Sequence, residues 1–81
     1  YSYFSSAFYL YLITNQEKYI NEITKVSAKA KRMTEQEKLL VVDTLILQKK
    51  YKYAFDMAKD IKNISSLKVA LLAIKLRDYS K

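Results

Sequence analysis

The sequence predicts an all-α fold of about five antiparallel helices stacked as helical hairpins. Two observations carry this prediction. The 81 residues include no glycine and no proline, which are the residues that the tight turns of β-sheet proteins rely on. Apolar residues also recur at spacings of three and four over most of the chain, as they do on one face of an amphipathic helix.

The first predicted helix spans residues 2–14. Residues 1–14, "YSYFSSAFYLYLIT", carry no charge, and ten of the fourteen are apolar or tyrosine. This stretch is shorter than the roughly 20 residues that cross a bilayer, so we expect no transmembrane span. It also lacks the basic leader of a signal peptide. We therefore expect a helix that is buried on most sides, in a single domain (1–81) that is part of a larger chain, since the first residue is not Met.

The second predicted helix spans residues 16–33. Asn15 precedes it, and asparagine tolerates the left-handed backbone conformation that ends helices. The apolar residues of 16–33 then step by four, three, four and three, which places them on one face: Tyr19, Ile23, Val26, Ala30 and Met33.

The third predicted helix, 35–48, begins at a capping box formed by Thr34 and Glu37. Its run "LLVVDTLIL" also fits a buried strand, but its length and its cap favour a helix. Lys49 and Lys50 follow where glycine is usual. We expect an exposed link there, in which the two lysines complement the negative end of the helix dipole.

The fourth and fifth predicted helices span residues 50–62 and 66–79. The fourth ends near Asn63, and Ser65 or Ser66 caps the fifth. The two apolar faces consist of Tyr51, Ala54, Ala58 and Ile61, and of Leu67, Ala70, Leu71 and Ile74. Links of one to three residues force neighbouring helices to lie antiparallel.

Two segments, 15–45 and 47–76, repeat the same order of features with an offset of 32 residues. A period in the low thirties is typical of stacked helical hairpins. Within them, "VVDTLILQKKYKYAFDMAKDIKN" resembles the tetratricopeptide-repeat family, with Tyr51 and Ala54 at the family's tyrosine and alanine positions. The chain departs from the family where Val42 and Lys49 replace small residues and where the closing proline is absent. An unrelated small right-handed helical bundle is the alternative.

The resemblance covers residues 35–76 well and 8–34 loosely. It implies a non-catalytic protein–protein interaction or scaffold module whose partner docks along the first helices of the hairpins. Carried over to this sequence, the partner-binding residues would be Gln36, Leu39, Asp43 and Ile46.

Catalysis is not expected from this set of residues. There is no histidine to act as a common general base, no cysteine nucleophile and no glycine for a phosphate-binding loop. We expect no cofactor and no metal. Asp56 and Asp60 lie four residues apart and could hold a cation, but Lys52 and Lys59 flank them, which favours a solvated, salt-bridged face.

The net charge is +7, which favours acidic proteins or peptides as partners. Lys18, Lys25, Lys29 and Arg32 fall on one side of the second helix. A basic bundle that binds nucleic acid or an anionic surface is therefore an alternative function. It is less favoured, because no aromatic residue alternates with these charges and arginine is scarce.

Aromatic residues crowd the first twenty positions, as Tyr1, Tyr3, Phe4, Phe8, Tyr9, Tyr11 and Tyr19. An 81-residue monomer cannot bury all of them, and tyrosine is common at protein interfaces. A third hypothesis is therefore a small oligomeric structural subunit that self-associates through its aromatic first helix.

Overall fold

The computed structural model describes residues 3–62, 64 and 66–79. These residues form five helices and no strand, which confirms the all-α prediction. The helices are α1 (Tyr3–Thr14), α2 (Glu17–Lys29), α3 (Glu35–Leu47), α4 (Tyr51–Lys59) and α5 (Ser66–Tyr79). Asn63 and Ser65, which the sequence places at helix ends, lie outside the described residues.

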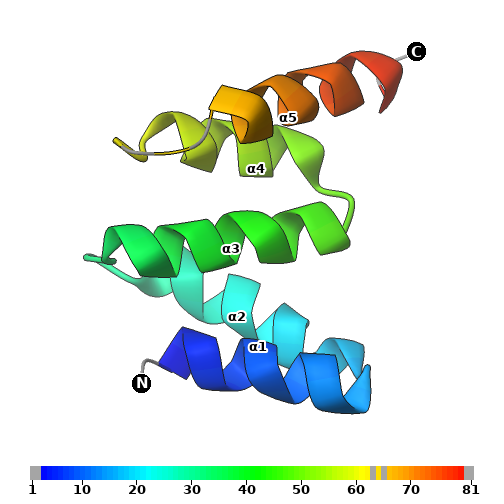
Figure 1. The fold of residues 1–81 in the computed structure, drawn as a ribbon. Coiled ribbons are helices and arrows are strands. Elements are labelled where there is room, and N and C mark those ends of the chain that lie inside the picture. The colour runs from blue at the N-terminus through cyan, green and yellow to red at the C-terminus, as the bar shows by residue number, and fades with distance from the viewer. Residues whose placement is uncertain (1–2, 63, 65, 80–81) are drawn as a thin grey trace.

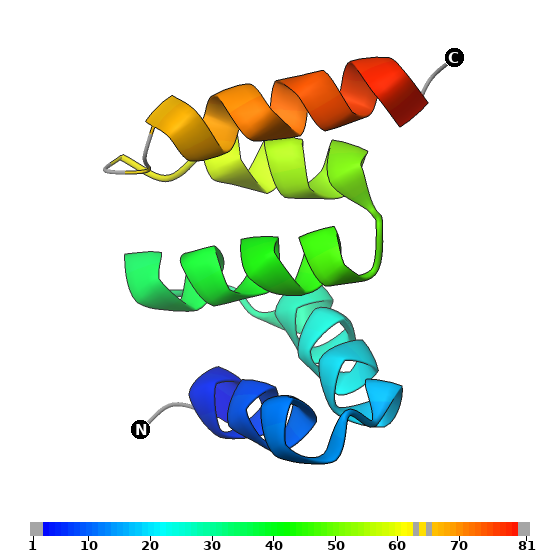
Figure 2. The same ribbon diagram turned by 45° about the vertical axis from the view of Figure 1, so that its right-hand side comes forward.

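The helices stack in chain order and form two layers. In Figure 1, α1, α3 and α5 lie nearer the viewer, and α2 and α4 lie behind them. The central helix, α3, packs against α1, α2 and α4, while α5 packs against α4. Figure 2 shows the same order from the side, with α1 at one end of the stack and α5 at the other. Both terminal helices therefore have one side with no helix on it.

The core is centred on α3 because its apolar residues lie all around the helix. Val41, Val42 and Leu45 are buried, and Leu39, Leu40 and Ile46 pack against the core. On α4, Ala54 and Ala58 are fully buried, and these small side chains allow α3 and α4 to approach closely. The other buried core residues are Phe4, Ala7, Ile20, Ile23, Ile61 and Leu72.

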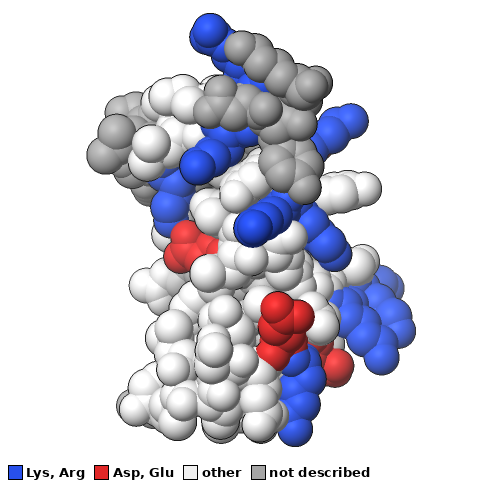
Figure 3. Space-filling view, turned by 90° about the vertical axis from the view of Figure 1, so that its right-hand side faces the viewer, with Lys and Arg blue, Asp and Glu red and all other residues white. Residues whose placement is uncertain are grey.

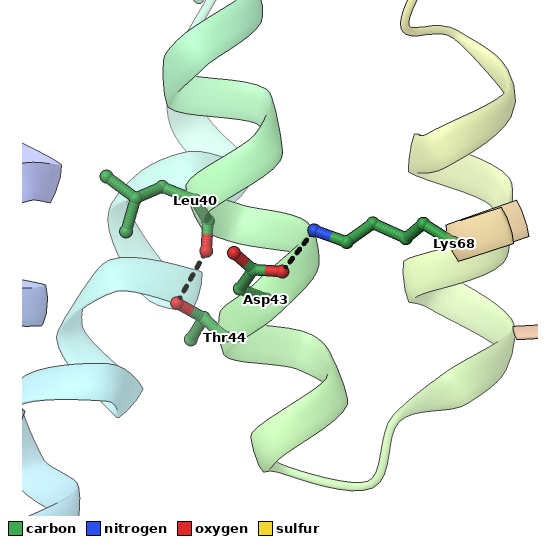
Figure 4. Close-up of polar contacts among 4 residues, drawn as sticks. All are labelled: Leu40, Asp43, Thr44 and Lys68. Carbon is green, nitrogen blue, oxygen red and sulfur yellow. Dashed lines mark hydrogen bonds and ion pairs between the residues drawn. The ribbon is translucent and has the colours of Figure 1, made fainter. Parts of the chain in front are cut away.

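Thr44 is a fully buried polar side chain. Its hydroxyl donates a hydrogen bond of 2.8 Å to the Leu40 carbonyl one turn earlier on α3, as Figure 4 shows. A buried hydroxyl without a partner would cost free energy, so this bond is what allows threonine inside the core.

Two helices, α2 and α4, end three or more residues earlier than the sequence predicts. α2 ends at Lys29 rather than at residue 33, because Ala30 takes an extended conformation (φ −73°, ψ 130°). Met33 still packs against the core, but from the link that follows the helix. α4 likewise ends at Lys59 rather than at residue 62, and Ile61 is buried beyond it. The apolar spacing in the sequence continues past the ends of α2 and α4 because the link residues Met33 and Ile61 also pack in the core.

The capping box of α3 is present. The Glu37 amide donates to the Thr34 hydroxyl at 3.1 Å, and the Glu37 carboxylate accepts from the Thr34 amide at 2.9 Å. Both bonds satisfy amides that the first turn of a helix leaves without intrahelical partners. Thr34 is itself extended (φ −68°, ψ 164°), which is the conformation that lets an N-cap side chain reach the first turn.

Lys49 replaces glycine in the turn between α3 and α4. Its φ is +61°, in the left-handed region that glycine favours. The Lys50 amide donates to the Leu45 carbonyl at 2.9 Å, and the Lys49 amide donates to the Ile46 carbonyl at 3.0 Å. This pair of bonds is the Schellman motif, which satisfies carbonyls that would be unpaired at the helix end. Asn15 takes the same backbone conformation after α1, with φ +56°.

We predict that Lys49→Gly stabilises the protein. A left-handed backbone conformation costs an L-residue roughly 1–2 kcal/mol, and glycine avoids this cost. Glycine also makes the unfolded chain more flexible, which favours unfolding and offsets part of the stabilisation. The free energy of unfolding should therefore rise by less than about 1 kcal/mol in denaturant titrations.

Lys50→Gly is the matched control, because it removes the same charge at a residue whose φ is −93°. It should lower the free energy of unfolding. Equal losses in the two variants would contradict the proposed strain at Lys49.

Candidate protein-interaction groove

A groove runs along α3 on the side where α2 and α4 lie. Among the described residues, α2 and α4 both pack against α3 but not against each other, which leaves the space between them open. The groove has a volume of about 610 Å³ and its floor is formed by Val41 and Leu45. Its walls and ends are Thr24, Ser27 and Ala28 of α2, Tyr53, Asp56 and Met57 of α4, and the link residues Lys50 and Asp60.

The groove is mainly apolar in character. On the α4 wall, Tyr53 is 66% exposed, and Met57 offers a flexible, polarisable side chain. On the α2 wall, Ala28 is small, and the hydroxyls of Thr24 and Ser27 donate to carbonyls of their own helix at 3.0 and 2.9 Å. Because these hydroxyls already have acceptors, the wall does not require polar groups from a ligand.

The rim of the groove on α4 carries two carboxylates, those of Asp56 and Asp60. Asp56 pairs with Lys59 at 3.6 Å, but both side chains are more than half exposed, so the pair is weak. Asp60 is the residue that caps the C-terminus of α4, where the helix dipole repels a negative charge. With Lys50 as the one basic residue among the described residues of the groove, the rim has an acidic side at α4, although the chain as a whole is basic.

The described residues contain no group of three or more carboxylate, histidine or cysteine side chains placed to hold a metal ion. The Asp56–Lys59 pair is the salt bridge that the sequence predicts for this face of α4.

The partner-binding residues that the resemblance implies lie on the opposite side of α3 from this groove. Asp43 is two residues from both Val41 and Leu45, which corresponds to about 200° around a helix. Gln36 is exposed, whereas Leu39 and Ile46 are half-buried and pack against the core.

Asp43 is joined to α5. Its carboxylate accepts a hydrogen bond of 2.7 Å from the Lys68 ammonium, as Figure 4 shows, and these side chains are 43% and 32% exposed. A partner that binds the predicted face through Asp43 would have to compete with Lys68.

The predicted basic side of the second helix is only partly assembled. Lys18, Lys25 and Lys29 are exposed on α2, but Arg32 lies in the link beyond the end of that helix. The Lys18 ammonium lies 5.1 Å from the centre of the Tyr19 ring. Glu17 and Glu22 belong to the same helix, so the three lysines do not form an uninterrupted positive surface.

The aromatic residues of α1 divide between its two sides. Phe4 is buried, Phe8 and Tyr11 pack against the core, and Tyr3 and Tyr9 are exposed. The pKa of Tyr3 is raised above its ordinary value, mainly because its half-exposed ring loses some contact with water and also because the Glu22 carboxylate of α2 lies nearby. Tyr1 lies outside the described residues, and no described helix is long and apolar enough to cross a membrane.

Sequence reasoning missed the groove residues of α4. The apolar face predicted for that helix, which includes Ala54 and Ala58, is the one that packs into the core. Tyr53 and Met57 lie four residues apart on another side. The sequence does contain a signal for them, because Tyr53 and Met57 are large apolar residues on an otherwise polar side of the helix.

We predict that the Asp43–Lys68 pair contributes more to stability than the Asp56–Lys59 pair. The first joins α3 to α5 and is partly shielded from water, so a double-mutant cycle with alanine should give a coupling of about 0.5–1 kcal/mol. The second is a solvated pair within one helix, for which about 0.3 kcal/mol is expected. Couplings in the reverse order would contradict this anchoring of α5.

No protein-family model matches the chain, and no curated protein and no solved structure matches it significantly. The resemblance to tetratricopeptide repeats thus rests on the residues quoted above, and the function has to be argued from the groove and the surface.

Proposed function

We propose that this chain is a non-catalytic protein–protein interaction module, of the tetratricopeptide-like helical-hairpin type, whose groove between α2 and α4 binds a short helical segment of a partner. The observation that carries the proposal is the apolar groove of about 610 Å³ over Val41 and Leu45. The stacking of α1, α3 and α5 on one side and α2 and α4 on the other supports the hairpin assignment (Figure 1).

The shape of the groove favours a helix as the ligand. Its floor is formed by Val41 and Leu45, one turn apart on α3, and its two long walls are themselves the helices α2 and α4. An amphipathic helix laid between two helices inserts apolar side chains at spacings of three and four, which is a recurring mode of peptide recognition. Tyr53 and Met57 would line one side of such a helix and Ala28 the other.

The charges at the rim favour a basic residue on the partner helix. The net charge of +7 predicts acidic partners, but the groove presents Asp56 and Asp60 locally. A lysine or arginine placed opposite them would relieve the repulsion between Asp60 and the C-terminus of α4. We therefore expect a partner segment that is apolar along one side and carries a cation at its edge.

The proposal is tested by selecting binders from a display library of random helical peptides. We predict that Ala28→Phe abolishes binding of most selected peptides, because the new ring fills the groove from an exposed position. Ala70→Phe is the matched control, since Ala70 is also exposed but lies on α5. Fluorescence anisotropy measures both variants, and circular dichroism confirms that each is folded.

Removal of a charge at the rim gives a second measurement. Asp60→Asn should weaken the binding of selected peptides that contain a cation at least several-fold, and should leave the binding of neutral peptides unchanged. Selection that returns no binder, or binders that tolerate Ala28→Phe, would contradict the proposed groove. Salt-sensitive binding of duplex DNA that depends on Lys18, Lys25 and Lys29 would instead support the nucleic-acid alternative.

A further inference from the structure

The outer side of α5 is apolar at its centre and basic at both edges. Leu71 and Ile74 are 53% and 54% exposed, and Ala70 is exposed beside them. At about 100° per residue, these three side chains cover an arc of about 100° around the helix. Lys75 lies about 40° beyond Leu71, and Arg77 lies about 20° beyond Ala70. An exposed cation therefore borders the apolar arc on each side.

The inner side of α5 is fixed to the rest of the fold, which keeps the outer side exposed. Leu72 is only 2% exposed, and α4 packs along this side of the helix. The Lys68 ammonium donates to the Asp43 carboxylate of α3 at 2.7 Å. The apolar arc and its two cations are therefore presented on a helix that is already folded, and a ligand does not first have to order it.

The positive charge of the chain is concentrated toward the same end of the helix stack. Residues 49–81 hold nine lysines and arginines against three aspartates, whereas residues 1–48 hold six lysines and arginines against five carboxylates. Figure 3 shows the result on one face of the molecule. Basic side chains project from the upper part, where α4 and α5 lie, and from the right, while the lower left, where α1 lies, is white. An anionic surface is therefore attracted most strongly to the α4–α5 end.

We propose that the chain attaches to an anionic membrane surface through the outer side of α5. The helix lies in the plane of the interface, with Leu71 and Ile74 inserted among the lipid chains and with Lys75 and Arg77 at the level of the charged headgroups. Interfacial amphipathic helices bind in this way, and the aliphatic stems of their cations lie along apolar surface while the charged ends reach the headgroups. The groove residues come from α2, α3, α4 and the links beside them, so attachment through α5 leaves the groove accessible to a partner.

The combination of groups on α5 selects a lipid surface over other anionic partners. Nucleic acid offers phosphates to the two cations, but its charged backbone has no apolar layer that could receive Leu71 and Ile74. An acidic protein pairs best with arginine, whose planar group binds a carboxylate through two parallel hydrogen bonds. The cations of residues 49–81 are all lysines except for Arg77. A lysine is a point charge on a flexible stem, which suits a fluid layer of headgroups better than a fixed set of carboxylates.

The strength of this attachment depends on the anionic lipid content of the membrane. Each lysine or arginine near an anionic leaflet raises the partition coefficient about fivefold. This attraction is screened by salt over about 10 Å at 0.1 M ionic strength, whereas the contribution of the inserted aliphatic side chains is not. We therefore expect weak, reversible binding to vesicles that contain phosphatidylserine, less binding at high salt, and little binding to phosphatidylcholine alone.

Co-sedimentation with vesicles tests the proposal, using phosphatidylcholine alone and an equal mixture of phosphatidylcholine and phosphatidylserine. The double variant Lys75→Glu, Arg77→Glu should bind the mixed vesicles at least about tenfold more weakly than the natural protein. The double variant Lys25→Glu, Lys29→Glu is the matched control, because it changes the net charge equally at two exposed positions of α2. Its loss of binding should be much smaller. Circular dichroism checks that both variants are folded.

Substitution of an apolar residue separates a membrane from other anionic partners. Leu71→Ser should weaken binding to the mixed vesicles at least several-fold, because it removes one of the two inserted side chains. Leu12→Ser is the matched control, since Leu12 is 62% exposed on α1, and it should leave binding unchanged.

A spin label gives a second measurement, because the natural chain contains no cysteine. When mixed vesicles are added, a label on Leu71→Cys should become immobilised and accessible to oxygen dissolved in the bilayer. A label on Leu12→Cys should stay in water.

The proposal would be overturned if the natural protein bound neither kind of vesicle or bound both equally well. Binding that needs Lys75 and Arg77 but tolerates Leu71→Ser would also overturn it, because α5 would then contact a polyanion without an apolar layer. Salt-sensitive binding of duplex DNA that is lost in the same double variant would identify that polyanion as nucleic acid. Loss of vesicle binding in Leu12→Ser would place the contact on α1 instead of α5.

Discussion

The fold depends on the need to remove α3 from water on nearly every side. Its run "LLVVDTLIL", residues 39–47, has no side that is both continuous and polar, and a helix of that kind is stable only when other elements surround it. α1, α2 and α4 pack directly against it, and α5 reaches it through the Lys68–Asp43 ion pair. Thr44 is tolerated in this setting only because its hydroxyl bonds back to the helix itself.

The same constraint produces the groove. α2 and α4 both contact α3 but not each other, so a space remains between them. The two small alanines of α4 allow that helix to lie close to α3. Val41 and Leu45 therefore form part of the core and also the floor of an opening. The architecture and the proposed binding function rest on one row of side chains.

Global and local electrostatics differ in this protein, and the difference matters for its partners. The net positive charge lies largely on the links and on α5, because the lysines of α2, α3 and α4 are offset by carboxylates of the same helices, whereas α1 has no charge and the groove rim at α4 has two carboxylates. Long-range attraction follows the net charge, but contact energies follow the groups that are desolvated together. An acidic protein can therefore be attracted to the molecule as a whole while the groove favours a basic side chain and α1 favours an uncharged surface.

The sequence by itself determined the helices, because their signals are local. The apolar spacing of α2, the Thr34–Glu37 capping box and the turn at Lys49 each involve residues fewer than six positions apart, where backbone hydrogen bonding and side-chain periodicity decide the outcome. Only the tertiary structure decided where α2 and α4 end, since Met33 and Ile61 are apolar for packing that continues beyond the helices. It also decided that the open groove lies opposite Asp43, because which side of an apolar helix stays uncovered depends on distant segments that no local pattern describes.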